Sequence, residues 1–95
     1  MSYEYRPLNQ ETLRRVIRTR AITVDGRVQI SLAPEARWAI IQNVSDADVY
    51  VGNSTVDNTN GFKLSPGESL AFNFLPGFEI YAYANNKEIR VMEVE

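Results

Sequence analysis

The chain has 95 residues, of which ten are basic and twelve acidic, and it contains neither cysteine nor histidine. A chain of this length forms one domain with a modest core. Without cysteine there are no disulfides or thiolate metal sites, and without histidine the usual general base and the commonest metal ligand are missing. No stretch reads as a secretory signal or approaches the ~20 apolar residues of a membrane span. We therefore expect a soluble protein with no membrane partner.

Charge is distributed unevenly along the chain. Residues 1–27 hold six arginines and three acids, whereas residues 28–95 hold four basic and nine acidic side chains, so a segment of net charge +3 precedes one of −5. This asymmetry fits an arm that docks on an acidic protein or on another copy of the chain. The basic segment contains no lysine, and we expect no nucleic-acid partner.

The first 20 residues are predicted to form a separate N-terminal arm. Residues 1–8 are polar and aromatic and contain Pro7, which favours an extended segment. Asn9 is a suitable N-cap for a short helix over residues 10–19, where apolar residues recur at helical spacing. Frequent β-branched residues from Val16 to Val24 leave an extended conformation open. The arm residues expected to contact a partner are Tyr3, Tyr5, Arg6, Arg14, Arg15 and Arg18.

Residues 21–95 are predicted to form an all-β domain of about eight short antiparallel strands, as a β-sandwich or a jelly-roll-like barrel. Apolar and polar residues alternate, and turn signals recur every 8 to 12 residues. Asp25-Gly26 favours a type I′ hairpin, and Asn85-Asn86-Lys87 indicates a second hairpin. Residues 45–48 indicate a hairpin or a tight corner. Strands are expected over residues 21–24, 27–32, 37–43, 49–52, 62–64, 69–75, 78–84 and 88–94.

The parity of the last strand changes near its end. Ile89 and Val91 face the expected core, whereas Met92 and Val94 have the opposite parity. This pattern indicates a bulge, or an interface on the second face, near the C-terminus.

The longest polar loop covers residues 53–61, where short polar side chains are expected to bond to the local backbone. Asp57, Asn58 and Asn60 carry oxygens of the type that Ca²⁺ takes, but the loop lacks the bidentate glutamate and regular alternation of a calcium loop. We therefore expect no metal site.

The remaining chemistry does not indicate catalysis. The acids are scattered through turns and strand ends, where they are normally solvated, and the five glycines punctuate strands without a phosphate-binding spacing. We expect neither an enzyme nor a cofactor.

A second apolar set lies where a monomeric sandwich would carry polar groups. An outer face of this kind either stacks on sugar rings or is buried against another copy of the chain, and the small size favours the second reading. The residues of this expected subunit interface or glycan-stacking face are Tyr50, Tyr81, Tyr83 and Met92.

Four segments resemble small structural proteins of tailed bacteriophages. In those proteins an I-x-N-x-S…VYVG strand pair precedes a G…L-x-P-G-E turn and an IYA-x-A…IRVLEV close. The corresponding segments here are IIQNVSDADVYVG (residues 40–52), GFKLSPGESL (61–70), FEIYAYA (78–84) and IRVMEV (89–94). The resemblance spans about residues 38–95 and transfers no catalytic residue; residues 1–37 have no such match.

The resemblance implies a capsid decoration (cement) protein of the virion, made in the host cytoplasm. It would bind the major capsid protein as a homo-oligomer, with a trimer favoured. Two alternatives remain open: a glycan- or host-surface-binding module of a head or tail fibre, and a neck or tail connector component.

Overall fold

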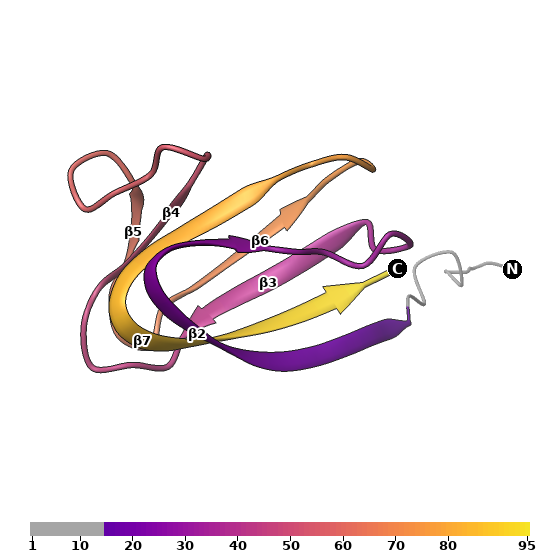
Figure 1. Cartoon of the computed structure of the whole chain (residues 1–95). Helices are drawn as coiled ribbons and strands as arrows, with labels where there is room; N and C mark the ends of the chain where they lie inside the picture. The colour runs from indigo at the N-terminus through magenta and orange to yellow at the C-terminus, as the bar shows by residue number, and fades with distance from the viewer. Residues whose placement is uncertain (1–14) are drawn as a thin grey trace, which may run out of the picture.

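The computed structural model describes residues 15–95 as one antiparallel sheet that curls into a half-barrel (Figure 1). The all-β, antiparallel prediction is confirmed, with six strands where about eight were expected, and no helix occurs within residues 15–95. The strands are β2 (Val16–Ile30), β3 (Trp38–Asn43), β4 (Val49–Gly52), β5 (Phe62–Leu64), β6 (Ser69–Asn73) and β7 (Ile80–Val94).

A long two-stranded ribbon of β2 and β7 forms the frame of the sheet, and it bends sharply at its middle (Figure 1). Val24 pairs with Lys87 and Gly26 with Ala84, so that two residues of β7 lie opposite the single residue Asp25. This is a β-bulge, which increases local bend and twist. Gly26 and Asn86 take positive φ angles of 77° and 56° at the bend.

Both hairpins predicted from the sequence are wrong, because their turn residues lie at the bend of the ribbon. Asp25-Gly26 and Asn85-Asn86-Lys87 do not reverse the chain; they lie opposite each other inside two continuous strands. Dipeptides that tolerate positive φ suit a bulge as well as a type I′ turn. The pairing of β2 with β7 along their whole length decides between the two outcomes.

The two halves of β7 have different neighbours on the side away from β2. The C-terminal half pairs with β3, and β3 pairs with β6. The N-terminal half pairs with β4, and β4 pairs with β5. The order is therefore β5-β4-β7-β3-β6, with β2 along the other edge of β7. The chain passes between the two halves at residues 44–48, which form the corner that was one of the two predicted arrangements.

Asn43 holds this corner in place from a fully buried position. Its Nδ2 donates to the carbonyl oxygens of Ala47 (2.7 Å) and Leu64 (2.8 Å), and its Oδ1 accepts from the backbone N–H (2.9 Å) and hydroxyl (2.7 Å) of Ser45. All of its polar atoms are bonded, so burial costs little. Asn43 and Ser45 thus have a structural role in this chain.

The core lies on the concave face of the curled sheet. The core residues of β7 are Ile80, Ala82 and Ala84 before the bulge and Ile89 and Val91 after it. The inward-facing positions change from even to odd numbers because the bulge inserts one extra residue. A second register shift lies at the C-terminal end of β7, where Ile17 of β2 is the extra residue opposite Glu93 and Val94. The sequence had left a bulge or an interface open at this end of the chain. The other buried members are Val24, Ile30, Ile41, Val49, Val51 and Leu64.

The predicted helix over residues 10–19 is wrong for the part that the structure describes. Residues 16–19 belong to β2, and this strand continues through residues 20 and 21 without a break. Val16, Ile17 and Thr19 are β-branched and suit a strand, and pairing with β7 overrides the weak helical spacing. Residues 10–14 lie outside the described range.

Candidate functional site

The three tyrosines predicted for the outer face do lie together on it. Tyr50 of β4 pairs directly with Tyr83 of β7, and Tyr81 follows two residues away, opposite Gly52. Their inward neighbours Val51 and Ala82 are buried in the core, so the tyrosines point away from it. All three are half-buried.

Met92, the fourth residue of that predicted group, lies elsewhere. It pairs with Thr19 of β2 and Ile40 of β3 on the outer face of the other half of the sheet. There it lines a separate hollow with Gln42 and Arg90. The predicted face is therefore split between the two halves of the bent ribbon.

The polar loop of residues 53–61 folds back over the tyrosine half of the outer face. Its one large apolar residue, Val56, is 1% exposed and packs between Gly52 and Gly61. A Cβ on Gly61 would lie 2.6 Å from the Tyr50 Cβ and 2.7 Å from the Val56 Cγ2. Arg27 fastens the loop from β2, since its Nε donates to the Val56 carbonyl oxygen at 2.9 Å. In the sequence, this packing was indicated only by Val56, a large apolar residue within an otherwise polar segment.

Side chains within the loop bond to the local backbone, as predicted. Asp57 Oδ1 accepts from the Thr59 hydroxyl (2.6 Å) and from the N–H groups of Thr59 (2.8 Å) and Asn60 (3.3 Å). These bonds, the Thr59 hydroxyl first, hold the pKa of Asp57 below its ordinary value. The side-chain oxygens of Asp57 and Asn60 accept hydrogen bonds within the turn. No group of three or more acidic side chains within residues 15–95 could hold a metal ion.

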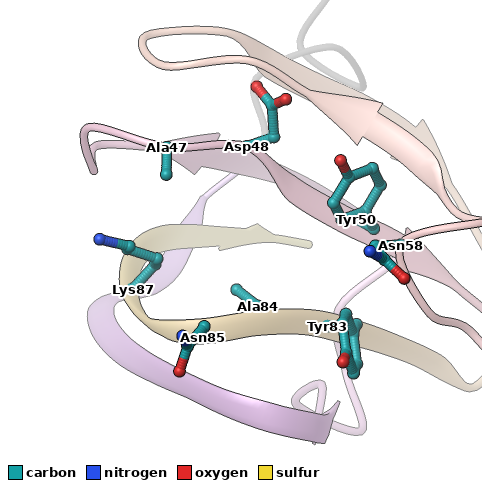
Figure 2. Close-up of a pocket in the computed structure, with 8 residues that line it drawn as sticks. All are labelled: Ala47, Asp48, Tyr50, Asn58, Tyr83, Ala84, Asn85 and Lys87. Atoms are coloured by element: carbon teal, nitrogen blue, oxygen red, sulfur yellow. The ribbon is translucent and has the colours of Figure 1, made fainter.

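Beside the loop, a surface hollow of about 340 Å³ opens between the start of β4 and the middle of β7 (Figure 2). Tyr50 and Tyr83 contribute aromatic walls, and in the view of Figure 2 Asn58 lies between their rings. The remaining lining residues are Ala47, Asp48, Ala84, Asn85 and Lys87. Tyr81 does not line the hollow. Both aromatic and hydrogen-bonding groups therefore border one concave surface.

A second candidate site is an apolar surface that the sequence did not indicate. We call it the phenylalanine surface; it consists of Phe62, Phe72, Phe74, Leu75 and Phe78. The rings of Phe72, Phe74 and Phe78 lie 5.6 to 5.8 Å apart, centre to centre. Phe62, Leu75 and Phe78 are 60%, 76% and 44% exposed.

The phenylalanine surface occupies the open side of the half-barrel. A hollow there is lined by Phe62 of β5, Leu70 of β6, and Phe78, which precedes β7. β5 and β6 lie at opposite ends of the strand order β5-β4-β7-β3-β6. The phenylalanine surface therefore connects these two edge strands. Alternation within a strand shows which side chains share a face, but it does not show that the sheet stays open beside Phe74 and Phe78.

The predicted arm residues fall into two groups. Tyr3, Tyr5, Arg6 and Arg14 lie outside the described residues. Arg15 and Arg18 belong to the body: the Arg15 side chain bonds Glu95 at 2.8 Å, and Arg18 Nε bonds Glu93 at 2.8 Å. Both guanidinium groups thus engage carboxylates at the C-terminal end of β7.

Glu93 is a charged residue that is fully buried. Its Oε2 accepts from Arg18 and from Arg20 Nε (3.0 Å), and its Oε1 accepts from the Ala33 N–H at 2.6 Å. Both arginines also donate to the Ser31 carbonyl oxygen. Burial raises the pKa of Glu93, but the bonds from Arg18, Ala33 and Arg20 together hold that pKa below its ordinary value. This cluster joins β2, β7 and the β2–β3 loop.

Comparisons with known proteins found no match to this chain among protein-family profiles, curated protein sequences or solved structures. Residues 15–95 include no helix long and apolar enough to cross a membrane.

Proposed function

We propose that this chain is a virion structural protein of a tailed bacteriophage, a capsid decoration protein that binds the head shell as a homo-oligomer. The phenylalanine surface is the observation that carries the proposal. It holds three of the five large apolar side chains that are exposed within residues 15–95. Contiguous exposed apolar side chains mark interaction surfaces in soluble proteins.

The geometry of this surface favours a second copy of the chain as its occupant. The surface spans the free edges of β5 and β6, and apart from Glu79 the residues that line its hollow are uncharged. Homo-oligomer contacts are apolar at their centre and depleted of charge. A neighbouring copy would cover the open side, and the sandwich or jelly-roll arrangement expected from the sequence would then be completed between subunits. The phage-like motifs favour a trimer.

The partner in the shell is the major capsid protein, reached through the N-terminal arm. Residues 1–14 carry Arg6 and Arg14 and the aromatic residues Tyr3 and Tyr5. Each arm adds a modest contact, and an oligomer that bridges neighbouring capsid subunits gains avidity from several contacts at once. In this proposal the protein is located in the virion, stabilises the head mechanically, and has neither enzymatic activity nor a cofactor.

Co-sedimentation with heads of the encoding phage tests the proposal. Purified heads lacking the protein are mixed with the full chain or with a chain that lacks residues 1–14. The deletion stops there because β2 begins at Val16 and Arg15 bonds Glu95. We expect the full chain to sediment with the heads and the shortened chain to stay in solution with an unchanged circular dichroism spectrum. Failure of the full chain to bind heads would refute the decoration role.

A further inference from the structure

We propose that the hollow at Tyr50 and Tyr83 binds a neutral saccharide unit. The two tyrosines pair across β4 and β7, which places their Cβ atoms about 4.5 to 5.5 Å apart. Ring contacts between described residues join Phe72, Phe74 and Phe78 only, so the tyrosine rings do not stack on each other. Both rings line the hollow and are half-buried, so the exposed part of each can meet the C–H groups of a sugar ring.

The polar groups around the tyrosines suit sugar hydroxyls. Asp48, Asn58 and Asn85 line the hollow, and none of the side-chain hydrogen bonds within residues 15–95 involves them. The carboxylate accepts hydrogen bonds, and each amide both donates and accepts. Because neighbouring hydroxyls of a sugar also donate and accept, the two sets are complementary. Asn53, Asp57 and Asn60 of the same loop instead accept hydrogen bonds from the loop's own backbone N–H groups.

The volume of the hollow and the charges around it indicate which kind of saccharide it could bind. A volume of about 340 Å³ lies at the small end of the range for ligand sites, enough for one or two sugar rings at the end of a glycan. Lys87 is the cation of the hollow, and its Nζ already pairs with Asp46 Oδ1 at 3.0 Å. The Asp48 carboxylate is left without a cation, which disfavours a sugar that carries its own carboxylate. The site therefore fits a neutral saccharide.

Saturation-transfer NMR on the full chain tests this site directly. The probes are methyl glycosides of glucose, galactose, mannose and N-acetylglucosamine, with N-acetylneuraminic acid as the anionic comparison. We expect at least one neutral glycoside to bind, and Tyr83→Ala to weaken that binding at least tenfold. Asn58→Ala should weaken it severalfold, and we expect this variant to fold because the Asn58 side chain is exposed. Tyr83→Phe, which keeps the ring, should retain most of the affinity.

Tyr81→Ala is the matched control, because Tyr81 lies on the same strand and face outside the hollow. It should leave the affinity unchanged. No binding of any neutral glycoside, binding of the anionic sugar alone, or equal affinity in wild type and Asn58→Ala would each overturn the proposal. Sugar binding is independent of the subunit contact proposed above, since neither tyrosine belongs to the phenylalanine surface, and the solution mass reports on that contact separately.

Discussion

Removing the buried carboxylate of Glu93 should destabilise the fold through a specific set of lost bonds. In Glu93→Ala the Ala33 N–H, which belongs to a 7% exposed residue, loses its acceptor. An orphaned buried N–H costs about 1 to 3 kcal/mol. Arg18 and Arg20 lose their carboxylate, but their side chains are 42% and 28% exposed, so each lost pair counts for about 1 kcal/mol or less.

The expected loss for Glu93→Ala is therefore about 3 kcal/mol, a large share of the ~5 to 15 kcal/mol that stabilises a typical domain. For a chain of this size it corresponds to a drop in melting temperature of about 10 to 20 °C. Glu93→Gln keeps an oxygen for the Ala33 N–H, but its amide NH2 cannot accept from Arg18 and Arg20 as Oε2 does, so we expect a loss of about 1 to 2 kcal/mol. Urea unfolding followed by circular dichroism measures both values.

Glu95→Gln is the matched control for charge loss. Its pair with Arg15 is exposed, with side-chain exposures of 68% for Arg15 and 45% for Glu95, and should contribute less than about 0.5 kcal/mol. If Glu93→Gln proves as damaging as Glu93→Ala, the bond to Ala33 is not the main contribution. If neither variant changes stability, the buried cluster does not hold this end of the sheet.

The same residue predicts how stability depends on pH. The pKa of Glu93 is held below its ordinary value of 4.5, so its contribution is fully present above that value. The contribution is lost as the pH falls through the lowered pKa of the folded state. We expect the unfolding free energy of the wild type to fall more steeply below pH 4.5 than that of Glu93→Gln. Parallel curves for the two proteins would contradict this reasoning.

Two glycine variants test the bend and the loop packing by thermal denaturation. Gly61→Ala places a methyl group 2.6 Å from the Tyr50 Cβ, and we expect a loss of about 2 kcal/mol with shifted NMR signals for Tyr50 and Val56. Gly26→Ala meets no atom within 4 Å, so only its positive φ opposes the change and the loss should be about 1 kcal/mol. The reverse ranking would contradict the packing of Val56 on the outer face.

The middle of the fold could be predicted from the sequence because its signals are local. Turn residues flank the segments of β3, β4, β5 and β6, which are apolar or alternating, and the structure confirms strands at all four. The placement of the tyrosines on one outer face followed from the same alternation. Local pattern was sufficient wherever a strand began and ended at a turn.

The frame of the sheet could not be predicted in this way. Asp25-Gly26 and Asn85-Asn86 carry the same local signal whether they close hairpins or bend a ribbon, and only the pairing of two segments about 60 residues apart distinguishes the cases. Glu93 shares the core-facing parity of Ile89 and Val91, but its charge gave no signal of burial, because the arginines that pair with it lie 75 and 73 residues away in the sequence. The exposure of Phe78 depends on the open side of the sheet, which no periodicity reveals.

The solution mass tests the proposed assembly most directly. Light scattering is measured over a range of concentrations for the wild type, for a Phe62→Ser, Phe78→Ser double variant, and for Val44→Ser as a control. Val44 is an exposed apolar residue, 40% exposed, outside the phenylalanine surface. We predict a stable oligomer, with a trimer favoured, for the wild type and Val44→Ser, and a folded monomer for the double variant. A wild type that stays monomeric at every concentration would contradict the account.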